Sequence, residues 1–240
     1  MNAAAAASAP RGRWAEAWPD ALAFAGGLAL AWRGDWQTGD LIWSLWLSGL
    51  VVGYALIVWS LTAPLRDLRR GMAADASAVA GPAAKAATVG VILIGTLFGL
   101  AFFTVHFGGF HFVHSVFLNA FFPVTDGRGF PDAQVYRIVF SRYWIFLPLA
   151  FLAERAAFRK VDAPEKDDLA VTPEAITRRK ARNGNSGLMA PYKGVVRMHL
   201  LIFFFAFAHF ARIENFFVYA VVYAVYFFPW RLLAKKNAAR

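Results

Sequence analysis

Residues 87–122 read ATVGVILIGTLFGLAFFTVHFGGFHFVHSVFLNAFF, an apolar stretch of 36 residues without a single Asp, Glu, Lys or Arg. About 20 apolar residues suffice for a helix to cross the hydrocarbon core of a bilayer. The stretch is therefore a membrane-span candidate and is too long for one ordinary span. Gly108-Gly109 divides it. Either the helix continues beyond the membrane, or residues 110–122 fold back as an interfacial or re-entrant piece, which is the arrangement we favour.

Apolar runs separated by blocks of charge extend over the whole chain, 59% of whose residues are hydrophobic. Five further runs extend over about Trp18–Trp32, Leu41–Leu61, Ile138–Ala153, Val195–Ala211 and Asn215–Leu233. This segregation is typical of multi-pass membrane proteins. The sequence predicts an all-α, polytopic membrane helix bundle of about six transmembrane helices, forming one domain over residues 16–234. Thr38 or Asp40 is expected to cap the second helix.

Polar segments flank and interrupt this domain. Residues 1–15 begin with an alanine-rich, low-complexity stretch and predict a disordered tail, and residues 235–240 form a basic C-terminal tail. The largest internal polar segment is 154–193. Within it, Thr172-Pro173-Glu174 predicts the start of a short basic helix that ends near Asn183-Gly184, because it combines a cap, a proline at the first helical position and an acid.

The distribution of basic residues predicts the topology. Lys and Arg collect at the N-terminus, in 62–86, in 154–193 and in the C-terminal tail. The opposite boundaries hold fewer of them: Arg33, Arg128, Arg137, Arg142 and Arg212. By the positive-inside rule, both termini and the loop 154–193 are cytoplasmic, in the inner membrane of a bacterium. The net charge of +10 then points to anionic lipid headgroups at the cytoplasmic face as partners, and not to nucleic acid.

The chain contains no cysteine, which excludes disulfides, thiolate metal sites, iron–sulfur clusters and a cysteine nucleophile. Two pairs of glycines at GxxxG spacing, Gly49/Gly53 and Gly95/Gly99, predict close helix packing. Such small-residue faces also allow a homo-oligomer or a membrane-protein partner.

The histidines are the one hint of chemistry. Counting 1.5 Å per residue from Ala87 and Val195 places four of them, His106, His111, His114 and His209, at one outer boundary of the membrane. Imidazole is a common metal ligand and also ligates haem. We therefore expect these four to bind a transition metal such as zinc, copper or iron. Acid and amide groups on the same side could form its second shell: Asp126, Glu214 and Asn215.

Two other readings remain open beside metal handling or a metal-dependent membrane reaction. One is a non-catalytic membrane scaffold or accessory subunit, in which the histidines only hydrogen-bond at the interface. The other is a b-type haem electron carrier that uses His106 or His114 with His209. The same counting places His199 near the cytoplasmic face, where it and Arg197 form a possible functional pair, although we favour snorkelling or loop-tethering groups.

Two segments, TVHFGGFHFVHSVF at 104–117 and GLMAPYKGVVRMH at 187–199, together resemble a bacterial family of six-span integral membrane proteins of unknown function. The resemblance implies a His-aromatic-Gly-Gly-Phe motif and a Met-x-Pro-Tyr…Arg-x-His motif. The positions that it marks are His106, Gly108, Gly109, His114, Pro191, Tyr192, Arg197 and His199. The resemblance makes Arg197 and His199 stronger functional candidates than the residues alone do. It implies no activity.

Overall fold

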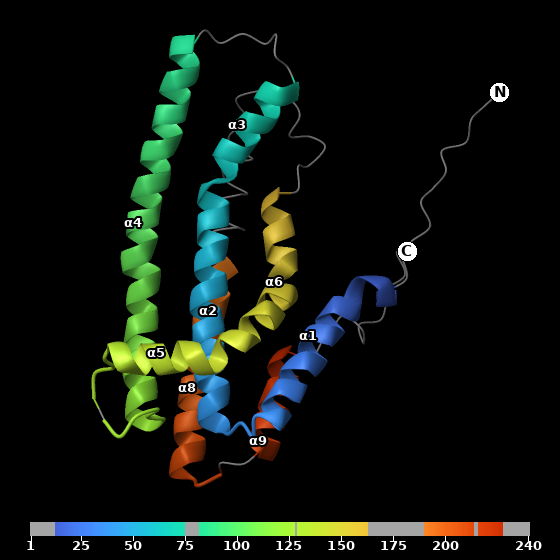
Figure 1. Cartoon of the computed structure of the whole chain (residues 1–240), viewed down its shortest axis with the longest axis vertical. Coiled ribbons are helices and arrows are strands. Elements are labelled where there is room, and N and C mark those ends of the chain that lie inside the picture. The colour runs from blue at the N-terminus through green and yellow to red at the C-terminus, as the bar shows by residue number, and fades with distance from the viewer. Residues whose placement is uncertain (1–12, 75–81, 128, 163–189, 214–215, 228–240) are drawn as a thin grey trace, which may run out of the picture.

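The computed structural model describes residues 13–74, 82–127, 129–162, 190–213 and 216–227, and within them the chain is all helical (Figure 1). The α-helices are α1 (Arg13–Arg33), α2 (Thr38–Leu61), α3 (Ala63–Ala74), α4 (Pro82–Phe121), α5 (Ala133–Tyr143), α6 (Leu147–Asp162), α8 (Ala190–Phe210) and α9 (Phe216–Phe227), with a 3-10 turn at Trp144–Phe146. The predicted all-α class is confirmed for these residues. The helix predicted after Thr172, the tail 235–240 and most of the N-terminal tail lie outside them.

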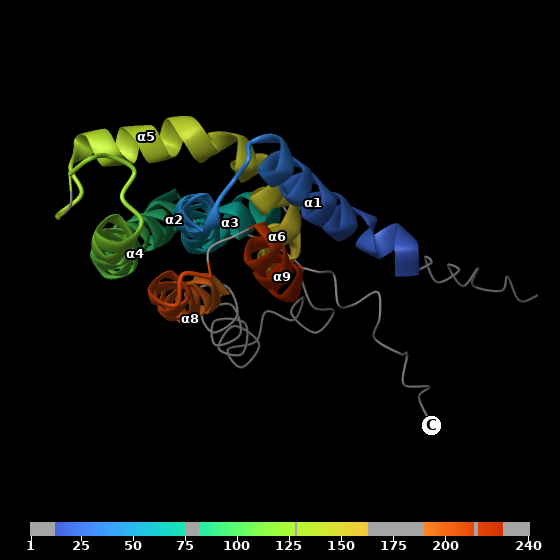
Figure 2. The ribbon, with the colours of Figure 1, turned by 90° about the horizontal axis from the view of Figure 1, so that it is seen from below.

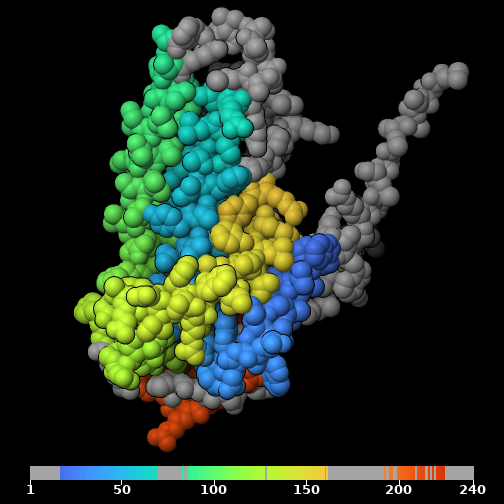
Figure 3. Space-filling model, in the orientation of Figure 1, coloured from blue at the N-terminus to red at the C-terminus, as the bar shows by residue number. Residues whose placement is uncertain are grey.

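Three of the described segments are long and apolar enough to cross a membrane: Thr38–Leu61, Ala86–Phe121 and Ala133–Arg159. A shorter apolar segment covers His199–Ala208 in α8. The window of high hydropathy in Ala86–Phe121 contains no buried residue, and Figure 3 shows α4 forming one edge of the molecule. An apolar surface of this length and exposure is what a bilayer covers.

The helices pack around α2 in alternating directions. In Figure 1, α1, α4 and α8 run toward one end of the molecule, whereas α2, α6 and α9 run toward the other. Figure 2 views the molecule from the end toward which α1, α4 and α8 run, and there α2 lies between α5 on one side and α8 on the other. The first half of α2 contributes six of the eighteen buried residues in the main core cluster of the described chain, and Leu41, Ile42 and Trp43 are fully buried.

α4 is one continuous helix from Pro82 to Phe121. The expected break at Gly108-Gly109, with residues 110–122 folded back, is therefore wrong. A glycine in a helix costs only about 1 kcal/mol relative to alanine. Both glycines are flanked by apolar residues, and neither φ is positive, so the regular hydrogen-bond ladder prevails.

The segment expected as a single fourth span is bent. α5 lies across the bundle in Figure 1, and α6 rises from its end. The 3-10 turn at Trp144–Phe146 makes the corner, with the Leu147 amide bonded to the Trp144 carbonyl. Pro148 follows directly, and its ring nitrogen cannot donate to a carbonyl four residues back. Pro148 was therefore a sequence signal for the bend, but the apolar composition of the segment favoured a single straight span.

Close packing of α2 on α4 depends on Gly53. A Cβ atom at Gly53 would lie 2.5 Å from Cζ of Phe107, a ring that is itself fully buried. One turn away, a Cβ atom at Gly49 would lie 3.5 Å from Nε2 of His111. The first GxxxG pair thus works as predicted, by letting α4 side chains reach the backbone of α2.

Candidate functional site

A histidine pair joins α4 to α8. Nε2 of His114 lies 2.6 Å from Nδ1 of His199, and the two ring centroids are 4.6 Å apart. His114 is 2% exposed, whereas His199 is exposed. The contact is a hydrogen bond in which one nitrogen donates and the other accepts. The other ring nitrogen of His114, Nδ1, is buried and has no hydrogen-bond partner, so one polar atom of this pair is left unsatisfied.

His199 was expected at the opposite boundary of the membrane from His114, and that expectation is wrong. The two helices are parallel, since Tyr192 contacts Phe107 and Phe210 contacts Phe121. Counting depth from Ala87 and Val195 assumed that both apolar runs begin at one level. The continuous α4 instead begins much farther from the shared end than α8 does.

His111 lines the same region from one turn earlier in α4. Its ring centroid is 6.3 Å from that of His114, and its side chain is 3% exposed. Its Nδ1 lies 3.1 Å from the carbonyl oxygen of Phe107. A carbonyl only accepts, so Nδ1 carries the proton and Nε2 keeps a lone pair. The backbone of His111 is held as well, because the indole N–H of Trp46 donates to its carbonyl at 2.8 Å.

The polar face of α4 continues beyond the histidines, toward the C-terminal end of the helix. The hydroxyl groups of Ser115 and Tyr136 are 2.8 Å apart, and the Asn119 side-chain amide donates to the carbonyl of Gly129 at 3.0 Å. Ser115 and Asn119 are both buried. Because His111, Ser115 and Asn119 recur at intervals of four residues, they form one stripe on the helix. Sequence reasoning concentrated on the histidines and missed this stripe, although its spacing was visible.

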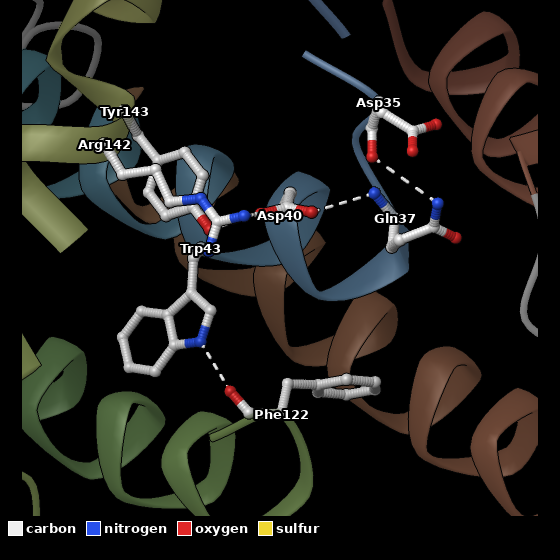
Figure 4. A network of polar contacts seen from close by, with 7 residues as sticks. All are labelled: Asp35, Gln37, Asp40, Trp43, Phe122, Arg142 and Tyr143. Atoms are coloured by element: carbon white, nitrogen blue, oxygen red, sulfur yellow. Dashed lines mark hydrogen bonds and ion pairs between the residues drawn. The ribbon is translucent and has the colours of Figure 1, made fainter. Parts of the chain in front are cut away.

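A buried carboxylate fixes α5 beside the site (Figure 4). The Tyr143 hydroxyl donates to Oδ1 of Asp40 at 2.7 Å, Arg142 lies 3.3 Å from the same oxygen, and the backbone N–H of Gln37 donates to Oδ2 at 2.8 Å. The N-cap residue of α2 is therefore Gln37 and not Thr38, whereas Asp40 does help to cap the helix start, because its side chain accepts the Gln37 backbone N–H in a capping box. The indole N–H of Trp43 donates to the carbonyl of Phe122 at 2.8 Å, which anchors the end of α4.

The described structure separates the predicted four histidines. His106 precedes His114 by eight residues, about 12 Å along α4, and His209 follows His199 by ten, about 15 Å along α8 in the same direction. The backbones of His106 and His209 are therefore roughly 27 Å apart along the bundle. No group of three or more His, Asp or Glu side chains arranged for a metal occurs among the described residues.

The remaining candidate residues fall in different places. Asp126 is exposed in the loop after α4. Glu214 and Asn215 lie outside the described residues, as do the side chains of Arg197 and His209. A second polar contact that the sequence reasoning missed is the ion pair of Asp20 in α1 with Arg155 in α6. Both side chains are largely buried, which ties the first helix to the bundle.

The comparisons with known proteins are limited to one family. No curated protein and no solved structure is detectably similar to the chain. A family model described as a family of unknown function (DUF6498) matches residues 6–228, nearly the whole chain. The resemblance to an uncharacterised family is thereby confirmed at that level, and the chain belongs to this family of unknown function.

Proposed function

We propose that this chain is a six-span protein of a bacterial inner membrane, with both termini cytoplasmic, that binds a transition-metal ion between α4 and α8 for metal handling or a metal-dependent membrane reaction. The observation that carries the proposal is the His114–His199 contact. Ionisable side chains within apolar helices are rare and costly, and they mark functional sites by default. Here two of them come from different helices and face each other.

The donor set suits zinc, copper or iron. Zinc binds imidazole nitrogen at about 2.0–2.1 Å, so two imidazoles on one tetrahedral ion stand roughly 3.3 Å apart. The pair at 2.6 Å is the hydrogen-bonded form, and admitting an ion requires an opening of less than 1 Å. His199 is the exposed partner of the pair and His114 is the buried one, so we expect His199 to make this movement.

We assign His114 and His199 as ligands and His111 to the wall of the site. The Nε2 lone pair of His111 points toward Gly49 and reaches the pair only after a rotation of its side chain. Two protein ligands leave coordination positions for water or for groups that accompany the ion. This incomplete shell favours exchangeable binding, as metal handling requires, over a permanent structural site.

Two alternatives are weighed against the same geometry. A haem between the paired rings finds no support, because their centroids are only 4.6 Å apart and a macrocycle has to fit between its axial ligands. Pairing His209 with His106 or His114 finds none either, given their separation along the bundle. A scaffold role is favoured by the uncovered surface of α4, and a homo-oligomer or a membrane-protein partner would bind there.

The test is elemental analysis with a visible absorption spectrum, on detergent-purified protein without a His-tag. We expect about one equivalent of zinc, copper or iron in the wild type and a loss of at least tenfold in the double variant His114→Ala/His199→Ala. His199→Ala alone should lose most of the metal too, and it is the safer variant for folding because His199 is exposed. His106→Ala is the matched control on α4 and should keep its metal.

Three outcomes would contradict the assignment. Absence of metal after reconstitution with zinc, copper and iron salts would rule out the metal site and favour the scaffold role. A Soret band would restore the haem carrier. Loss of metal in His106→Ala, with retention in His199→Ala, would return the site to the histidines expected from the sequence.

A further inference from the structure

His106 lies on the lipid-facing side of α4, at a depth where only hydrocarbon is expected. Its side chain is exposed. The next residue, Phe107, packs against Gly53 of α2. Gly53 is about 22 Å from the first residue of α2 and about 12 Å from the last, at 1.5 Å per residue. An imidazole at this level faces neither membrane surface, provided that α2 and α4 cross the bilayer as proposed above.

Its ring packs against three aromatic side chains among the described residues, and no hydrogen bond of its imidazole occurs there. Phe102 stacks nearly parallel to the imidazole, with centroids 5.4 Å apart and a 16° interplanar angle. Phe110 stands perpendicular to it at 5.1 Å, and Tyr192 of α8 lies at 5.8 Å. We call these four residues the His106 cluster. Phe102 and Phe110 are 52% and 39% exposed, so rings remain open to a ligand on the lipid side.

A neutral imidazole has one N–H donor and one acceptor nitrogen. In hydrocarbon there is no water to satisfy them, and an unpaired polar group costs several kcal/mol. A partner that reaches this depth has to be soluble in the membrane and able to hydrogen-bond. Phospholipid head groups do not qualify, because they stay at the surface.

We propose that the His106 cluster binds the head group of a membrane-soluble quinone. A quinone carbonyl accepts the imidazole N–H, its planar ring packs on the exposed faces of Phe102 and Phe110, and its hydrophobic tail remains in the lipid. The assignment needs α4 to cross the membrane and is independent of the metal at His114 and His199, which is about 12 Å farther along the helix.

The test is photolabelling of the full-length protein, in nanodiscs of bacterial phospholipid, with an azido-benzoquinone that carries a decyl tail. Labelled positions are read by peptide mass spectrometry. We expect labelling concentrated on residues 102–110 in the wild type and lowered at least tenfold in His106→Leu. Gly109→Leu should lower it similarly. A Cβ atom added at Gly109 meets nothing within 4 Å, so the leucine is expected to occupy space beside His106 without disturbing the fold.

Phe117→Leu is the matched control. Phe117 is 49% exposed and lies eleven residues after His106, on the same side of α4, so its replacement should leave the labelling unchanged. Equal labelling along all exposed parts of α4, or equal labelling in His106→Leu, would mean simple partitioning into lipid and would overturn the proposal.

A second copy of the chain is the competing occupant of this surface. Because the chain has no cysteine, Val105→Cys introduces a single thiol beside His106, at a position that is 78% exposed. Efficient disulfide dimer formation at this position, together with absent quinone labelling, would assign the cluster to a protein interface instead. A metal-free protein that still labels at 102–110 would overturn only the metal site, so the two proposals fail separately.

Discussion

One aspartate positions α5 at the residue scale. Asp40 is 7% exposed, and it accepts hydrogen bonds from the Tyr143 hydroxyl and from the Gln37 backbone, with Arg142 beside it. A buried carboxylate is stable only when its oxygens are paired in this way. The network therefore fixes the angle at which α5 crosses the bundle, and with it the position of Tyr136 next to Ser115.

Removing one partner of this carboxylate should lower stability. Tyr143→Phe keeps the ring and deletes the hydroxyl, which leaves a buried acceptor less well satisfied at a cost of about 1–3 kcal/mol. The expected result is a lower thermal unfolding midpoint by circular dichroism in detergent. Ser141→Ala is the control on the same helix, because its exposed hydroxyl bonds only the Ile138 carbonyl. A midpoint equal to that of the wild type would show that Tyr143 does not support Asp40.

At the scale of elements, one glycine from each GxxxG pair, Gly53 and Gly95, should respond to alanine with opposite signs. Gly53→Ala places a Cβ atom 2.5 Å from the buried Phe107 ring, and such overpacking costs about 1–3 kcal/mol. Gly95→Ala meets nothing within 4 Å, so it should stabilise by about 0.5–1 kcal/mol through helix propensity. The measurement is the unfolding midpoint of each variant under identical detergent conditions. Equal shifts would contradict the packing of α2 on α4.

Sequence reasoning predicted the elements better than their register. The runs around Leu41–Leu61 and Val195–Ala211 were recognised because length and hydropathy are local properties of a segment. The contact of His114 with His199 depends on how far α4 slides along α8, which is set by side chains such as Phe107 and Tyr192 packing together. Pro148 was a local signal for the bend at Trp144–Phe146, but an otherwise continuous apolar run outweighed it.

At the scale of the whole molecule, the direction of each helix gives the topology an experimental test. The start of α2 and the end of α4 lie together, joined by the bond from Trp43 to the carbonyl of Phe122. Under the proposed six-span topology, single cysteines in Arg33→Cys and Asp126→Cys should react with an impermeant maleimide in intact cells. Arg69→Cys in α3 should react only after permeabilisation. All three positions are exposed, and the natural chain contributes no thiol.

Labelling of Arg33→Cys and Asp126→Cys from different sides would contradict the paired ends of α2 and α4. Labelling of all three variants from outside would mean that α2 does not cross. Arg69 and Arg70 lie at the opposite end of α2 from the loop after α4. Because basic residues collect on the cytoplasmic side, the charge distribution supports the orientation in which that loop is external.

The length of α4 has a consequence for the kind of bilayer that suits this protein. Its apolar segment Ala86–Phe121 has 36 residues, about 54 Å at 1.5 Å per residue. Even a tilt of about 40°, the upper end of the usual range, leaves roughly 41 Å to fit into a hydrocarbon core of about 30 Å. If α4 crosses the bilayer as proposed, some apolar surface emerges beyond the acyl chains, and a thicker, longer-chain membrane reduces that mismatch. Lipid chain length thus becomes a variable that acts on this helix more strongly than on any shorter neighbour.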